Sequence, residues 1–119
     1  MIRRVDFDVI SKYREEAERS GLCFAKNTLY FENFKEDTLM GFIGVLTYQN
    51  KITIKNIYVI DEYRGKGHFK GMLDFILSNY PKCRTFEATC TAMSIREFLR
   101  RGFKVSRIYK KYTKVVLSR

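Results

Sequence analysis

The chain has 119 residues, of which 45% are hydrophobic and 15% aromatic, with one proline, three cysteines and one histidine. This composition excludes a mainly disordered chain and predicts one folded domain over residues 1–119. No apolar run approaches the roughly 18 residues of a membrane span, and the first residues lack the apolar stretch of a secretory signal, so we expect no membrane partner. Lysine and arginine number 23 against 13 acidic residues, a formal net charge of +10 that favours an anionic partner.

The first predicted element is an amphipathic helix over Asp8–Ser20. Ile10, Tyr13 and Ala17 recur there at helical spacing, and Gly21 can end the helix. The N-terminal region is therefore expected to pack one helix against the rest of the fold.

Three strands with short polar turns between them follow, at Thr28–Phe34, Thr38–Tyr48 and Ile52–Ile60. Their β-branched and aromatic residues predict an antiparallel meander. Gly41 and Gly44 lie inside the second strand, where glycine more readily marks a bulge or a close backbone approach than a ligand site.

After the meander, a polar loop over Asp61–Gly67 leads into a helix over His68–Asn79, which Pro81 ends. The remaining predicted elements are a strand, a helix and a closing pair of strands, at Arg84–Thr89, Ala92–Arg101, Val105–Tyr109 and Tyr112–Leu117. This order predicts an α+β fold, in which a mixed, mostly antiparallel sheet is flanked by helices.

The positive charge is concentrated in the second half of the chain. The first 62 residues carry 9 basic and 10 acidic side chains, whereas the remaining residues carry 14 and 3. Such asymmetry indicates an anionic partner, and nucleic acid, a polyphosphate cofactor and an acidic protein all satisfy it.

The cysteines, Cys23, Cys83 and Cys90, are odd in number and form no Cys-x-x-Cys motif. Since His68 is the only histidine, a zinc site would need an unusual set of ligands. We therefore expect no metal site, and reduced thiols in a cytoplasmic protein.

The stretch from Asn56 to Leu73 joins a strand, a loop with two glycines and two cations, and a helix N-terminus. Helix N-termini leave backbone N–H groups unpaired and carry a partial positive charge. Gly65 and Gly67 would let this backbone approach a ligand. The combination predicts a phosphate-binding loop, with a simple turn as the alternative.

This stretch resembles the acetyl-CoA loop of the GNAT superfamily of N-acetyltransferases, which reads Arg/Gln-x-x-Gly-x-Gly/Ala after a strand ending in valine. Arg64 and Gly67 match the loop, and Phe69 stands where glycine or alanine is usual. A second block, Ser94 to Lys104, is similar to the family's later helix ending in Gly-Phe. The resemblance covers residues 28–117 and implies a minimal GNAT-like fold, in which a strand, a loop and a helix form the coenzyme A site.

The resemblance also implies that acetyl-CoA is the cosubstrate and that a primary amine of a protein or small molecule accepts the acetyl group directly. Backbone groups of the strand would pair with the pantetheine arm, and amides of the loop would bind the pyrophosphate. The implied cofactor-binding residues are Ile57, Tyr58, Val59, Arg64, Gly65, Lys66, Gly67, His68 and Phe69. His68 stands where the family usually has an apolar residue, which favours packing or a helix-start hydrogen bond over catalysis.

The catalytic residues depart from the family pattern. The usual tyrosine acid falls on Phe98, which cannot donate a proton. Glu87, on the strand where other members carry a glutamate, is the candidate base, with a simple ion pair as its alternative. Ser94 is a candidate acid, with Cys90 and Tyr58 as the other candidates and a helix-start or packing role as the alternative.

The last part of the chain holds more cations than coenzyme A needs. From Lys82 to Arg119 there are 11 basic and 2 acidic residues. The excess predicts either a cationic surface alone or a site for nucleic acid or an acidic protein. Tyr109 and Tyr112 would suit base stacking or strand core.

Three functions thus remain open. The first is an acetyl-CoA-dependent N-acetyltransferase. The second is an acyltransferase of the same fold acting on a nucleic-acid base or on a nucleic-acid-bound protein, and the third is a non-catalytic module that binds coenzyme A or nucleic acid.

Overall fold

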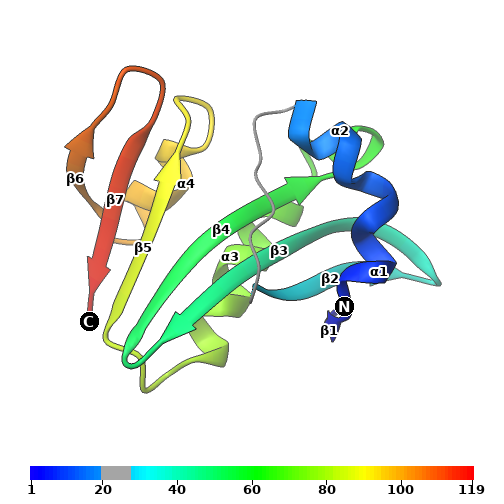
Figure 1. Ribbon diagram of the computed structural model, residues 1–119, viewed down its shortest axis with the longest axis horizontal. Coiled ribbons are helices and arrows are strands. Elements are labelled where there is room, and N and C mark those ends of the chain that lie inside the picture. The colour runs from blue at the N-terminus through cyan, green and yellow to red at the C-terminus, as the bar shows by residue number, and fades with distance from the viewer. Residues whose placement is uncertain (20–27) are drawn as a thin grey trace.

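A single seven-stranded sheet organises the protein (Figure 1), with the strand order β1-β2-β3-β4-β5-β7-β6. The computed structural model describes residues 1–19 and 28–119. The strands are β1 (Ile2–Val5), β2 (Leu29–Lys35), β3 (Thr38–Tyr48), β4 (Lys51–Val59), β5 (Thr85–Cys90), β6 (Lys104–Ile108) and β7 (Thr113–Ser118). Every neighbouring pair is antiparallel except β4 and β5, which are parallel. This confirms the predicted α+β fold with a mixed, mostly antiparallel sheet.

The helices lie on both faces of this sheet (Figure 1). On one face are α3 (His68–Asn79) and α4 (Ile95–Arg100), and on the other are α1 (Phe7–Ile10) and α2 (Arg14–Arg19). A 3₁₀ turn at Ser11–Tyr13 separates α1 from α2, so the predicted helix over residues 8–20 is interrupted. Its last residue, the predicted stop at Gly21 and Cys23 lie outside the described residues.

Two apolar clusters hold these layers together. The larger lies between the sheet and the α3–α4 side and contains Met72, Leu73 and Phe86, none of which is exposed. The smaller lies beneath α1 and α2 and includes Phe42 and Tyr58. The longest described helix, α3, has 12 residues, and no described helix could cross a membrane.

Strand β1 is an element that the sequence pattern did not predict. It pairs antiparallel with β2, although half of its residues are arginines. Arg3 forms an ion pair with the buried Glu32 (Nε–Oε1 2.6 Å), and its guanidinium lies 4.0 Å from the ring centre of Phe34. An ion pair and a cation–π contact therefore stabilise β1 in addition to its backbone pairing. Neither contact produces a hydrophobic pattern in the sequence, so the strand could not be predicted from one.

A β-bulge interrupts the pairing of β3 with β4. Gly44 lies opposite Asn56 and Val45 lies opposite Ile54, so Lys55 is the extra residue. A Cβ added to Gly44 would lie 2.7 Å from the ring of Tyr30. Only glycine leaves room for the Tyr30 ring beside the bulge. This agrees with the interpretation of Gly44 as a bulge or close-approach residue.

Gly41 shows the same kind of constraint. A Cβ at this position would overlap the carbonyl oxygen of Tyr58 and lie 3.2 Å from the Cα of Val59. The close backbone approach expected for Gly41 is therefore present, at the end of β4.

Several boundaries near the C-terminus differ from the prediction. The helix expected over residues 92–101 begins only at Ile95, because Thr91 to Ser94 form a turn in which the Ser94 N–H donates to the Thr91 carbonyl (3.2 Å). β6 ends at Ile108 and β7 begins at Thr113, so the two tyrosines expected in strands, Tyr109 and Tyr112, lie in the connecting turn. They are 44% and 40% exposed, and the strand-core alternative for them is wrong.

Candidate functional site

Strands β4 and β5 separate along their length, and this opening creates the candidate site. They pair only from Lys51 and Thr85 to Ile54 and Ala88. The bulge at Lys55 follows directly, after which β4 continues without a described neighbour on its β5 side. The edge of a strand without a neighbour presents backbone donors and acceptors to a ligand.

The opening holds a cleft of about 870 Å³, which is within the usual range for small-molecule sites. It is lined by the second half of β4, the end of β5, the loop before α3 and the first turns of α3 and α4. The cleft brings together most of the predicted site residues, namely Ile57, Tyr58, Val59, Arg64, Gly65, Gly67, His68, Phe69 and Ser94. Lys66 and Glu87 are not among the lining residues.

The loop before α3 has the backbone geometry of an anion-binding turn. Gly65 and Gly67 have φ angles of +78° and +87°, a left-handed conformation that other residues adopt at a cost. A Cβ at either position would meet nothing within 4 Å, so the space beside the loop is open. Gly67 is the N-cap of α3, and it leaves the first N–H groups of that helix without a side-chain cap.

The Arg64 side chain folds back from the loop onto β4. Its Nε donates to the carbonyl oxygen of Val59 (2.9 Å), and its Nη1 lies 3.0 Å from Asp61 Oδ1. The guanidinium also lies 5.5 Å from the ring centre of Tyr58. Arg64 therefore holds the loop against the strand end, whereas the exposed Lys66 makes no ion pair with a described residue.

His68 forms its hydrogen bond with a side chain of β2 rather than with the backbone at the start of α3, which has no side-chain cap. The Asn33 side-chain nitrogen lies 3.1 Å from His68 Nδ1, and because an amide nitrogen only donates, Nδ1 is the acceptor. The ring of Tyr63 contacts His68 edge-on, with ring centres 6.3 Å apart. These contacts favour the packing role over catalysis.

Phe98 and Phe69, two of the residues that depart from the family pattern, contact each other. Phe98 is 3% exposed and lies edge-on to Phe69, with ring centres 6.0 Å apart, and to Phe103, at 5.2 Å. These rings pack α4 against α3 at the wall of the cleft. Each large ring thus fills the space beside the other, and neither can donate a proton.

Three candidate proton donors line the cleft, and their surroundings differ. Ser94 lies directly before α4, where its Oγ accepts a hydrogen bond from the Thr91 N–H (3.2 Å). Burial raises the pKa of Cys90, whose Sγ donates to the Thr113 carbonyl (3.3 Å). Cys90 therefore stays a protonated thiol, which disfavours a nucleophilic role.

Tyr58 is joined to the N-terminal helices through its phenol. Its hydroxyl donates to Glu16 Oε1 on α2 (2.5 Å). Burial, followed by the hydrogen bond and charge of Glu16, raises the pKa of Tyr58 to about 12. The phenol stays protonated at neutral pH, and its proton is directed at a carboxylate.

Glu87 lies on the face of β5 that points away from α3 and α4. Its Oε1 is 2.7 Å from Lys51 Nζ, and its Oε2 is 3.4 Å from Lys114 Nζ. Burial raises the pKa of Glu87, but the hydrogen bonds and charges of the two lysines outweigh burial and lower it below 4.5. A lowered pKa weakens a base, so the predicted base role stays a prediction, with an ion-paired structural role beside it.

The Glu87 ion pairs predict a pH-dependent contribution to stability. Because the folded-state pKa is lowered, the carboxylate stabilises the fold above its unfolded-state pKa, near 4.5, and this contribution is lost as pH falls through the folded-state value. We expect Glu87→Gln to cost about 1–2 kcal/mol at neutral pH. Thermal melts should show that the difference from wild type shrinks as pH falls below the unfolded-state pKa; a difference independent of pH would contradict the assignment.

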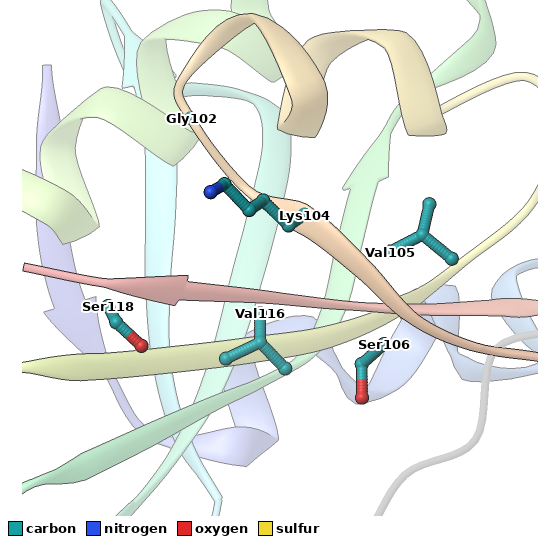
Figure 2. Close-up of a pocket in the computed structure, with 6 residues that line it drawn as sticks. All are labelled: Gly102, Lys104, Val105, Ser106, Val116 and Ser118. Atoms are coloured by element: carbon teal, nitrogen blue, oxygen red, sulfur yellow. The ribbon is translucent and has the colours of Figure 1, made fainter.

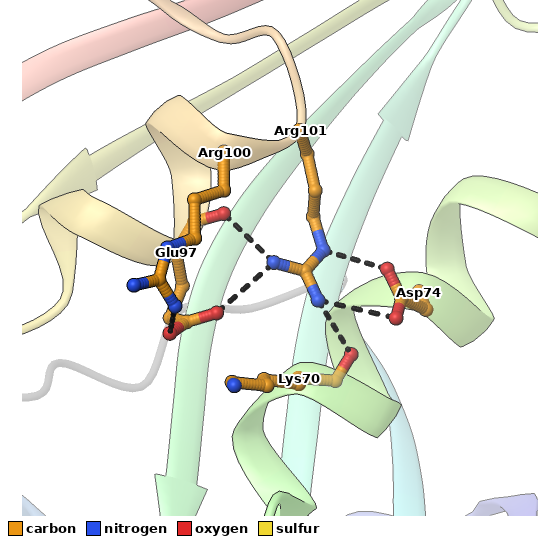
Figure 3. Close-up of polar contacts among 5 residues, drawn as sticks. All are labelled: Lys70, Asp74, Glu97, Arg100 and Arg101. Atoms are coloured by element: carbon orange, nitrogen blue, oxygen red, sulfur yellow. Dashed lines mark hydrogen bonds and ion pairs between the residues drawn. The ribbon is translucent and has the colours of Figure 1, made fainter.

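Arg101, which the sequence pattern did not single out, holds the α4 wall of the cleft onto α3 (Figure 3). Its guanidinium binds both carboxylate oxygens of Asp74 (2.6 and 3.1 Å). It also donates to the Glu97 carbonyl (2.9 Å) and lies 3.1 Å from Glu97 Oε2. The Arg101 side chain is only 15% exposed and Glu97 is 19% exposed, whereas Asp74 is 61% exposed, so the network joins the two helices from a largely buried guanidinium to a carboxylate at the surface.

Comparison with known proteins finds a family whose model matches this chain. The family model described as Acetyltransferase (GNAT) family matches residues 3–103. Among curated proteins, none matches this sequence.

Several solved structures share the fold. An IAA acetyltransferase from Bacillus cereus is 15% identical, with a TM-score of 0.80, covering 100% of this chain and 99% of that one. The ribosomal-protein-S18-alanine N-acetyltransferase from Escherichia coli is 15% identical (TM-score 0.77; 98% and 90% covered). The PaiA N-acetyltransferase from Thermoplasma acidophilum, in complex with coenzyme A, is 18% identical (TM-score 0.71; 97% and 80% covered).

Proposed function

Because this chain belongs to the acetyltransferase (GNAT) family, we propose that it is an N-acetyltransferase that transfers an acetyl group from acetyl-CoA to a primary amine. The observation that carries the proposal is the cleft where β4 and β5 separate, with the glycine loop at one end. Residues 1–119 would act as one domain. The free thiols of Cys83 and Cys90 support a reducing compartment such as the cytoplasm.

The described residues fit the cosubstrate. Gly65 and Gly67 leave open space in front of the loop, and the first N–H groups of α3 face a site suited to phosphate. The edge of β4 from Ile57 to Val59 has no described neighbour on its β5 side, and could pair with an extended amide-bearing arm. Solved relatives of the same fold are described as complexes with coenzyme A, which supports this ligand class.

In the proposed reaction, the protein positions the reactants and moves protons. Acetyl-CoA would supply the activated acyl group, whose carbonyl carbon bonds to the amine nitrogen as the carbon–sulfur bond breaks. The proton that the amine loses would pass to water. Ser94 lies at the cleft one turn before Phe98, and would hold a proton for the leaving thiolate in place of the tyrosine. Alignment of the two reactants in the cleft would supply a further part of the rate.

Two measurements test the proposal. Acetyl-CoA should raise the melting temperature of the protein, because a ligand that binds only the folded state stabilises it. Thiol release should then occur only when a suitable primary amine is added from a mixed panel. The absence of stabilisation would contradict the proposal, and stabilisation without thiol release from any amine would favour a non-catalytic coenzyme A module.

The role proposed for Ser94 gives a kinetic prediction. Ser94→Ala should lower kcat by roughly 100-fold, near the lower end of what a general acid contributes. The Kd for acetyl-CoA should change little, because the loop before α3 is untouched. Ser94→Thr keeps a hydroxyl and should recover most of the activity; an unchanged kcat in Ser94→Ala would remove this residue from the acid role.

A further inference from the structure

One part of the sheet has no described helix over one of its faces. The α3–α4 side covers the face that shows Ala88 and Val115, and α1 and α2 pack on the other face around Phe42 and Tyr58. Beyond the reach of α1 and α2, the strands β5, β7 and β6 carry no described element on that second face (Figure 1). We call this region the open face; its central side chains are Glu87, Thr89, Lys104, Arg107, Lys114 and Val116.

The pairing of the strands shows that these side chains share one side of the sheet. Glu87 lies opposite Val116 on β7, which in turn lies opposite Lys104 on β6. Lys114 lies opposite Arg107 and also forms the ion pair with Glu87. Directly opposite residues point to the same side. Figure 2 shows Lys104 and Val116 at a pocket of about 410 Å³ formed by β6, β7 and the turn before β6.

The open face and the adjoining turn between β6 and β7 are strongly cationic. Glu87, the described carboxylate at its centre, is already paired with Lys51 and Lys114. Four further cations are exposed and make no ion pair with a described residue, and these are Lys104, Arg107, Lys110 and Lys111. A surface of this kind attracts a polyanion and repels a second copy of itself.

Exposed aromatic rings distinguish the kind of polyanion. The Tyr109 N–H donates to the Tyr112 carbonyl (2.7 Å), so the two tyrosines lie together at the end of the hairpin. Both rings are substantially exposed, and the Arg107 guanidinium lies 5.2 Å from the ring centre of Tyr109. Cations alone would suit an acidic peptide, whereas exposed rings among cations are typical of surfaces on which bases stack.

We infer that the open face and the Tyr109–Tyr112 turn bind a single-stranded nucleic acid. The cations contact its phosphates, and the two tyrosines stack with its bases. Thr113, directly after the turn, pairs with Cys90, which lines the cleft. The bound strand therefore passes beside the cleft, although its binding does not depend on acetyl transfer.

Fluorescence anisotropy tests this binding without acetyl-CoA. The probes are a fluorescein-labelled RNA and a DNA of the same mixed sequence, each single-stranded and about 20 nucleotides long, which exceeds the site of one small domain. We expect binding whose affinity falls steeply between about 50 and 200 mM salt. A plot of the logarithm of the binding constant against the logarithm of the salt concentration should have a slope of about −0.7 for each phosphate neutralised. No binding of either probe at low salt would overturn the inference.

Variants locate the surface. Arg107→Glu with Lys111→Glu should weaken binding at least about tenfold. The control double variant, Lys35→Glu with Lys82→Glu, changes the net charge by the same amount at exposed positions outside the open face. It should weaken binding of the oligonucleotide far less. An equal loss of affinity in both double variants would overturn the inference. Thermal melts of each variant are the control that it is folded.

A further variant and a competitor distinguish nucleic acid from an acidic protein. Tyr112→Ser should weaken binding by roughly fivefold or more through lost stacking, with the salt slope unchanged. Polyglutamate of matched charge should compete poorly with the oligonucleotide. Equal competition by polyglutamate, together with full affinity of the Tyr112→Ser variant, would favour an acidic protein partner and overturn the inference.

Discussion

Replacing Gly67 with aspartate is expected to raise the Kd for acetyl-CoA by at least about tenfold, which corresponds to about 1.4 kcal/mol. Gly67 is the N-cap of α3, and a Cβ there would point into open space beside the loop. A carboxylate in that space would lie where the proposed diphosphate binds, and like charges at short range repel. Isothermal titration of the folded variant with acetyl-CoA measures the change.

Backbone strain is a separate effect at Gly67, because it does not depend on the charge of the new side chain. With φ at +87°, any residue with a Cβ is strained there by about 1–2 kcal/mol, and asparagine and aspartate tolerate this conformation best. Gly67→Asn has the same shape as Gly67→Asp without the charge, so it is the matched control. A Kd that rises equally in both variants would show that the charge is irrelevant, and an unchanged Kd in both would contradict the loop assignment.

Replacing Arg101 with alanine is expected to destabilise the fold by about 2–3 kcal/mol, because it leaves the carboxylates of Glu97 and Asp74 without their main partner. In a domain of this size the loss should lower Tm by roughly 10 °C. The KM for acetyl-CoA should also rise, since the same network holds the α4 wall of the cleft (Figure 3). Thermal melts and steady-state kinetics measure the two effects.

Arg100 provides the matched control for this prediction. It lies next to Arg101 on the same helix end, but its side chain is 56% exposed, and among the described residues it forms an ion pair with Glu97 alone (3.2 Å). Exposed ion pairs contribute little, so Arg100→Ala should cost no more than about 0.5 kcal/mol. An equal loss in Arg100→Ala, or a Tm unchanged in Arg101→Ala, would contradict the account of the network. Arg101→Lys should fail to restore stability, because lysine cannot bind two carboxylates with a planar fork.

Local patterns predicted the elements that bury continuous apolar faces. The strand at residues 38–48 and the helix at 68–79 were predicted with their observed bounds, because the strand is a nearly continuous apolar run between polar turns and the helix shows a broad apolar face that Pro81 ends. The short β1 was missed, since pairing with Glu32 compensates for its arginines. The exposure of Tyr109 and Tyr112 depends on where β6 ends, which alternation alone does not fix.

The candidate site was predictable in its loop and less so in its other parts. The glycines at 65 and 67 are readable as a turn that needs positive φ angles, and both have them. The bulge at Lys55, by contrast, depends on the register between two strands. The two lysines around Glu87 come from β4 and β7, and the partners of Arg101 come from two helices, so neither network is visible before the chain is folded.

Amide chemical shifts measured by NMR during titration with coenzyme A provide the most direct test of the proposed diphosphate site. The account predicts that the largest changes occur at the amides of residues 64–69, with a second group at 57–59 on β4. Pantetheine, which lacks the diphosphate, should change the chemical shifts of the amides of residues 57–59 alone. Saturating coenzyme A that leaves the loop amides unmoved, while amides elsewhere shift, would contradict the account.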